Sequence, residues 1–185
     1  MKKPATLVSA AVVVLLSLIA AFGVACGGNV RRPDGGFGLL PTGAAAPEVV
    51  GRLPGGAEVR LSAMKGKPVV VYFYPQDDTP GCTKEACAFR DAWKNLASAG
   101  IEVVGVSSNS AERHQKFQEK HQLPFALASD DSGEIGASYG VSKKIWGYDR
   151  VTFLVDREGR VAHVWPSVDP GVHANDVIQQ ASRLN

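Results

Sequence analysis

Cysteine is scarce in this sequence, and neither sign of charge is in excess. The 185 residues include only three cysteines, an odd number that leaves at least one outside any intramolecular disulfide. Lysine and arginine total 20 against 18 acidic residues, and the two classes are equal once Lys2 and Lys3 are set aside. This balance gives no indication of a nucleic-acid partner. No internal repeat is visible, so a repeat architecture is not expected.

Charged side chains are also missing from Ala5 to Ala25, an apolar stretch that follows the basic start Met1-Lys-Lys-Pro. This pattern predicts a secretory leader over residues 1–25. The sequence before Cys26 resembles a lipobox with Cys26 as the lipidated residue, although Gly23 stands where a large aliphatic residue is usual. Ordinary signal cleavage and a retained membrane-spanning anchor remain as alternatives. All three predict a domain outside the cytoplasm, on the periplasmic side of a bacterial membrane.

After the leader, residues 26–45 are rich in Gly, Ala and Pro and have few large apolar residues. This composition predicts a flexible tether between a membrane anchor and a folded domain. The domain is expected over residues 46–185, a length sufficient for one hydrophobic core.

The most informative stretch runs from Val69 to Leu96. Val69 to Tyr74 is rich in β-branched and aromatic residues and predicts a buried strand, which Pro75 ends. A loop rich in Asp, Pro and Gly follows, and a helical spacing of apolar residues begins at Cys82. Cys82 is therefore predicted in the first turn of a helix, where free N–H groups and the helix dipole favour a negative sulfur. A buried structural cysteine is the alternative.

A second cysteine, Cys87, follows five residues after Cys82. On an ideal helix these two Cα atoms are roughly 8.6 Å apart, whereas a disulfide needs about 7 Å or less. A static disulfide is disfavoured, and a reactive pair that bonds only after local unwinding fits the spacing. Thr79 lies three residues before Cys82, and its hydroxyl can bind a thiolate or a substrate oxygen.

The pattern Pro75-x3-Thr79-x2-Cys82 resembles the peroxiredoxin signature, and the surrounding residues resemble its Q-type (bacterioferritin comigratory protein) branch. The resemblance implies a thioredoxin-like fold and a thiol peroxidase. It implies that Cys82 is the peroxidatic cysteine and Cys87 the resolving cysteine. Pro75 would shield the site and Thr79 would position the peroxide. Arg150, just before Val-Thr-Phe-Leu-Val-Asp, occupies the position of the family's active-site arginine.

The resemblance covers about residues 46 to 184 and also implies substrates and partners. The substrates would be hydrogen peroxide or alkyl hydroperoxides, and a thioredoxin-like dithiol would be the reductant. No metal or organic cofactor is implied, and we expect a monomer. Ser108 and Ala88 depart from the family pattern, and neither takes part in the proposed chemistry. Glu85 has two interpretations, as a partner of Arg150 or as a favourable acid in the first helical turn.

The remaining pattern predicts a three-layer α/β sandwich, a mixed central sheet flanked by helices. We expect a hairpin over 46–61, a buried parallel strand over 101–107, a helix over 111–122, a short edge strand over 125–128, a short helix over 133–139, an antiparallel hairpin over 151–165 and a C-terminal helix over 173–184. His114 and His121, seven residues apart in the 111–122 helix, are interpreted as part of a solvated polar face.

Three other functions compete with the peroxidase. A thiol–disulfide oxidoreductase on the same fold predicts Cys-x-x-Cys, whereas this chain has Cys-x4-Cys. A copper-carrying lipoprotein predicts Cys-x3-Cys and a downstream His ligand, for which His163 and His173 are candidates. A redox sensor without enzymatic activity would need a partner domain.

Overall fold

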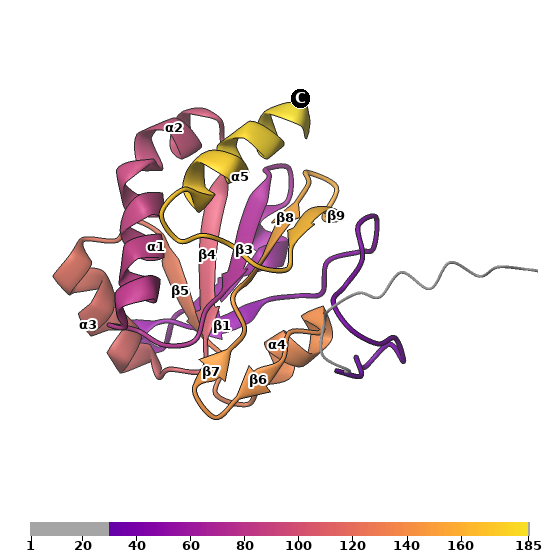
Figure 1. Ribbon diagram of the computed structural model, residues 1–185, viewed down its shortest axis with the longest axis horizontal. Coiled ribbons are helices and arrows are strands. Elements are labelled where there is room, and N and C mark those ends of the chain that lie inside the picture. Colours follow the sequence, from indigo (N-terminus) through magenta and orange to yellow (C-terminus); the bar gives the residue numbers. More distant parts are fainter. Residues whose placement is uncertain (1–29, 185) are drawn as a thin grey trace, which may run out of the picture.

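The computed structural model describes residues 30–184, which fold around one seven-stranded mixed sheet (Figure 1). Parallel pairs join β3 to β4 and β4 to β5, and all other neighbours are antiparallel. A separate hairpin of β6 (Lys143–Lys144) and β7 (Gly147–Tyr148) precedes β8. The strand order in the sheet is β2 (Glu58–Arg60), β1 (Val50–Arg52), β5 (Ala126–Ser129), β4 (Glu102–Ser107), β3 (Val69–Phe73), β8 (Val151–Val155) and β9 (Val161–Trp165).

Helices cover both faces of this sheet. One face packs against α1 (Pro80–Asp91), α2 (Trp93–Ser98), α3 (Ala111–His121) and α5 (His173–Ala181). The other packs against α4 (Glu134–Tyr139) and the 3-10 turn η2 (Leu61–Met64). Two further 3-10 turns are η1 (Pro54–Gly56) and η3 (Ser182–Leu184). The arrangement is the predicted thioredoxin-like sandwich.

Strand β3 lies inside the sheet, between β4 and β8, where its residues are buried on both faces. All five are buried, and successive side chains alternate between the two cores. Val69, Val71 and Phe73 join the core under α4, while Val70 and Tyr72 join the core under α1 and α5. The loop to α1 begins at the C-terminal end of this buried strand.

The structure corrects three of the predicted elements. The 125–128 strand is not at an edge, because β1 pairs with its outer side through Arg52 and Ser129. The helix predicted to begin at Cys82 begins two residues earlier, at Pro80. It is also interrupted at Ala92, so that α1 and α2 are separate helices.

The end of the predicted tether is in contact with the domain. Leu40 is buried and its N–H donates to the Tyr139 carbonyl. Gly43 and Ala44 exchange backbone hydrogen bonds with Val161 at the start of β9. Residues 40–46 therefore pack along the sheet, and any free tether to the domain ends before residue 40.

The predicted leader and Cys26 lie outside the described residues. Among residues 30–184, no helix is both long and apolar enough to cross a membrane.

Candidate active site

Cys82 is the third residue of α1, directly after the loop that leaves β3. Pro80 occupies the first helical position, where its missing N–H costs nothing. The first helical hydrogen bond runs from the Thr83 N–H to the Thr79 carbonyl at 2.8 Å. The amide of Cys82 precedes that bond and so belongs to the positive end of the helix. The residue is 2% exposed, so its sulfur is largely shielded from solvent.

Arg150 reaches Cys82 from the start of β8, the neighbour of β3 in the sheet. Its position follows from strand pairing, because β8 runs antiparallel to β3 and Val151 lies opposite Phe73. Arg150 precedes β8 and therefore lies beside the end of β3 from which the chain enters the Cys82 loop. Its Nη2 donates to the Cys82 Sγ at 3.2 Å, and its Nη1 donates to the Glu85 Oε2. One guanidinium thus bridges the sulfur and a carboxylate of the same helix.

Glu85 is buried one turn along α1 from Cys82, outside the first helical turn. The interpretation as a first-turn acid is therefore wrong, and the contact with Arg150 is the one observed. Burial raises the pKa of Glu85 to about 7, and the attraction of Arg150 offsets part of that rise. Burial alone would lower the pKa of Arg150, but Glu85 and Cys82 outweigh it and raise that pKa. Arg150 therefore stays a cation.

Thr79 and Pro75 belong to the loop between β3 and α1. Thr79 is the N-cap residue of α1, and its hydroxyl donates to the Gln76 carbonyl at 3.0 Å. Pro75 is half-buried, and β7 packs against it at Gly147, whose φ is +105°. A Cβ at position 147 would lie 1.9 Å from the Pro75 carbonyl oxygen. Only glycine permits this close approach between the hairpin and the loop.

The loop is held by a buried polar cluster that the sequence interpretation missed. Asp77 accepts hydrogen bonds from the Tyr74 hydroxyl at 2.7 Å and from the His114 Nδ1 at 2.8 Å. Its own N–H donates to the Asn109 side chain at 2.8 Å. Asp77 and His114 are both 0% exposed. The interpretation of His114 as part of a solvated face is therefore wrong. The sequence feature that indicates its burial is the three-residue spacing from His114 to Phe117, which places both side chains on the buried face of α3.

Cys87 lies in the same continuous helix as Cys82, and both are free thiols. Cys87 is half-buried on the side of α1 that faces α3, and its Sγ lies 4.0 Å from the Nδ1 of His121. The structure thus brings Cys82, Arg150 and Glu85 together, places Thr79 and Pro75 in the adjoining loop, and leaves Cys87 apart from Cys82.

The chain is similar to known proteins over the segment that carries this cluster. The profile of the AhpC/TSA family matches residues 42–164, which include the whole cluster around Cys82. The chain is 47% identical to a putative peroxiredoxin bcp of Coxiella burnetii over 130 residues, covering 66% of this chain and 86% of that protein. It is 42% identical to peroxiredoxin Bcp of Bacillus subtilis over 147 residues, covering 76% and 94%. The chain belongs to the AhpC/TSA family and is a peroxiredoxin of the Bcp/Q kind.

Solved structures agree with this assignment. The peroxidoxin BcpB of Mycobacterium tuberculosis superposes with a TM-score of 0.74 at 32% identity, covering 79% of this chain and 99% of that one. The bacterioferritin comigratory protein of Xanthomonas campestris, described for its alkyl peroxide reduction activity, gives 0.73 at 30% identity, with coverage of 81% and 99%. Peroxiredoxins are thiol peroxidases. The cluster at Cys82 therefore lies in the fold of an oxidoreductase family.

A second buried histidine of this peroxiredoxin, His173, begins α5 near Arg150. Its Nε2 is 2.8 Å from the Thr152 hydroxyl, and its ring packs edge-on against Phe89. Burial, aided by the positive charge of Arg150, lowers the pKa of His173 to about 4. His173 therefore stays neutral near pH 7 and adds no second charge beside Arg150.

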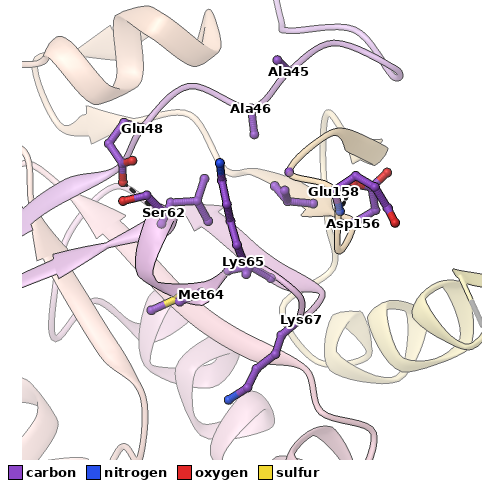
Figure 2. A pocket seen from close by; sticks show the side chains of 13 residues that line it. Ala45, Ala46, Glu48, Ser62, Met64, Lys65, Lys67, Asp156 and Glu158 are labelled. Atoms are coloured by element: carbon purple, nitrogen blue, oxygen red, sulfur yellow. Dashed lines mark hydrogen bonds between the residues drawn. The ribbon is translucent and has the colours of Figure 1, made fainter.

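A pocket of about 250 Å³ opens at the opposite end of the sheet (Figure 2). It is lined by Val69, the first residue of β3, and Val155, the last of β8, whereas Cys82 follows the other end of β3. Figure 2 shows Lys65 reaching across it toward Ala46. Neither cysteine nor histidine is among its lining residues, so the thiol chemistry of this peroxiredoxin takes place elsewhere.

Proposed function

We propose that Cys82 reduces hydrogen peroxide and organic hydroperoxides. The observation that carries this proposal is the 3.2 Å contact between the Arg150 Nη2 and the Cys82 Sγ at the start of α1. A guanidinium so close to the sulfur stabilises the thiolate, which is the nucleophilic form. Free N–H groups at the helix start act in the same direction.

The first step forms an S–O bond and breaks the O–O bond of the peroxide. The Cys82 thiolate attacks the terminal oxygen, which yields Cys82 sulfenic acid and a hydroxide or alkoxide that takes up a proton. Negative charge moves from the sulfur to the leaving oxygen. Arg150 and the amides at the start of α1 are placed to stabilise that charge. Thr79 is assigned to peroxide positioning and Pro75 to shielding the sulfur from solvent.

The second step joins Cys82 to Cys87. Both cysteines lie within α1, and residues five apart on an ideal helix have Cα atoms roughly 8.6 Å apart. Because a disulfide needs about 7 Å or less, the start of α1 must unwind before the bond forms. A thioredoxin-like dithiol then reduces the disulfide by thiol–disulfide exchange.

The proposed setting of the enzyme is extracytoplasmic, as a monomer tethered to the membrane. The support is the basic start and apolar stretch of residues 1–25 and the lipobox-like sequence before Cys26. Mass spectrometry of the protein isolated from the membrane and cytoplasmic fractions tests this setting. A lipid-modified Cys26 at the mature N-terminus is expected, and an unprocessed, unmodified chain in the cytoplasmic fraction would refute it.

Peroxide turnover with thioredoxin as electron donor tests the function. Wild type, Cys82→Ser and Cys87→Ser are compared, and the double variant controls for peroxide loss that needs neither cysteine. We expect Cys82→Ser to be inactive. Cys87→Ser should consume about one peroxide per chain and then stop as sulfenic acid or intermolecular disulfides. Peroxide consumption by wild type no faster than by free cysteine would refute the proposal.

A further inference from the structure

His121 lies between Cys87 and an acidic residue of the active-site loop. Its Nδ1 is 4.0 Å from the Cys87 Sγ, within the range of a hydrogen bond to sulfur. Its ring packs edge-on against Phe117 with a centroid distance of 5.0 Å, and the Arg90 Nη1 donates to its carbonyl at 2.9 Å. The side chain is 18% exposed. The ring is therefore held in place rather than free to turn away from the sulfur.

The far nitrogen of the same ring faces Asp78. His121 Nε2 is buried, has no hydrogen-bond partner among residues 30–184 and lies 3.5 Å from the Asp78 Oδ1. Asp78 is also bound by the Lys120 Nζ at 2.7 Å, and the two basic neighbours, Lys120 first, lower its pKa. Its backbone has a φ of +61°, unusual for a residue other than glycine. A carboxylate thus sits where it can keep the His121 proton on Nε2.

Building on the proposed function, we propose that His121 is the base that deprotonates Cys87, with Asp78 orienting its ring. A nucleophile, a base within hydrogen-bond reach and a third group that orients the base are the recurring parts of an activated thiol. With its proton on Nε2 facing Asp78, His121 presents the Nδ1 lone pair to the Cys87 S–H. The resolving thiol then needs no help from solvent to become a nucleophile.

The step balances in atoms and electrons. His121 Nδ1 takes the proton of Cys87, and the thiolate is released as α1 unwinds. The thiolate attacks the sulfur of the Cys82 sulfenic acid, so that an S–S bond forms and an S–O bond breaks. The departing hydroxide takes up a proton, and the imidazolium returns its own to solvent. One sulfenic acid and one thiol thereby give one disulfide and one water.

A packing role for His121 predicts a change of the disulfide-formation rate in the opposite direction. If the ring merely holds α1 against α3, removing it makes unwinding easier and disulfide formation faster. If it activates Cys87, removing it makes disulfide formation slower. Whether the variant forms the disulfide faster or slower than wild type therefore distinguishes the two roles.

The experiment is single-turnover peroxide oxidation of the reduced full chain, quenched at intervals and analysed by mass spectrometry for sulfenic acid and disulfide. The variants are His121→Gln and Asp78→Asn, and His163→Gln on β9 is the matched control. Asn tolerates the left-handed backbone at position 78, and circular dichroism verifies folding of all three. We expect unchanged sulfenic acid formation and a disulfide step slowed at least about 10-fold in His121→Gln, as removal of a general base slows reactions by about 10²–10⁴-fold.

Asp78→Asn should slow the disulfide step less than His121→Gln, and His163→Gln should not change it. A disulfide step in His121→Gln that is as fast as in wild type, or faster, overturns the proposal.

A second measurement does not depend on peroxide chemistry. The rate at which iodoacetamide alkylates Cys87 is followed against pH in a Cys82→Ser background, with and without His121→Gln. The charged groups around the pair are Asp78 from the loop, Arg90 from α1 and Lys120 from α3. His121→Gln should slow alkylation near pH 7, with recovery at higher pH, where solvent deprotonates the thiol.

Identical pH profiles with and without His121 overturn the assignment of the base. Failure of wild type to react with peroxide, combined with a His121-dependent alkylation rate, would instead overturn the peroxidase proposal and leave the activated thiol.

Discussion

The buried pair of Asp77 and His114 provides a sharp test of how the active-site loop is held. Asp77→Asn preserves the shape of the side chain and removes one of its two acceptor oxygens. Asp77 now accepts from both the Tyr74 hydroxyl and the His114 Nδ1, at 2.7 and 2.8 Å. An amide offers one oxygen and one NH₂ group, so one of the two donors loses its acceptor. No solvent can replace it, because Asp77 and His114 are 0% exposed.

The loss of free energy of unfolding in Asp77→Asn follows from this burial. A buried donor left without a partner costs about 1–3 kcal/mol. We expect Asp77→Asn to lower the free energy of unfolding by about 3 kcal/mol, the upper end of this range, because the unpaired donor is fully buried. In a protein of this size each kcal/mol lowers Tm by about 2–4 °C, so Tm should fall by about 6–12 °C.

The assay is urea unfolding of the reduced protein near neutral pH, followed by circular dichroism. Asp131→Asn is the matched control, because Asp131 pairs with Arg52 at 3.3 Å on the surface and both side chains are more than half exposed. Such a pair contributes about 0–1 kcal/mol. A loss of free energy of unfolding in Asp77→Asn that is no larger than in Asp131→Asn would refute the reasoning. A double variant with His114→Gln should cost less than the sum of the two single changes, because the two residues share one interaction.

Three further predictions concern groups near Cys82. Arg150→Met removes a charged hydrogen bond worth about 1.5–3 kcal/mol, so stopped-flow oxidation by peroxide should slow about 10- to 100-fold; an unchanged rate would exclude Arg150 from the reaction. His173, whose pKa is lowered from 6.5 to about 4, binds a proton in the unfolded chain before it does so in the native one. As pH falls from about 6.5 toward 4, the free energy of unfolding of wild type should therefore fall by up to about 3 kcal/mol relative to that of His173→Gln. Urea unfolding of both proteins measures this difference, and parallel pH profiles would contradict it. Gly147→Ala drives a Cβ into the Pro75 carbonyl and should lower Tm by more than Gly159→Ala. At Gly159 φ is also positive, but none of residues 30–184 has an atom within 4 Å of the added Cβ. Equal losses of Tm would show that the close approach is unimportant.

Local patterns in the sequence predicted the parts of the active site that one segment supplies. The strand over 69–74 and the following loop are determined by side-chain alternation and turn chemistry, which act over a few residues. A helix was correctly predicted after the loop, although it begins at Pro80 and is interrupted at Ala92. The position of Cys82 in the first turn and the separation of Cys87 by five residues follow from this local structure alone.

Arg150 shows what a local pattern does not contain. It lies 68 residues from Cys82 in the chain, and by composition alone an arginine before a strand resembles a surface charge. The family resemblance identified the position, but the contact with Cys82 and Glu85 exists because β8 pairs antiparallel with β3. The edge-strand prediction for 125–128 was wrong for a related reason, since only the folded sheet shows that β1 covers β5.

By itself the sequence determined a strand, a loop and a helix start with a thiol on it, because these depend on neighbours along the chain. Only the tertiary structure decided which distant groups surround the two thiols: Arg150 at Cys82 and His121 at Cys87. The same is true of His114, which looks solvated in a polar helix but is buried against Asp77. Strand pairing and helix packing join segments far apart in the chain, and the environment of each side chain follows from that packing rather than from its neighbours in sequence.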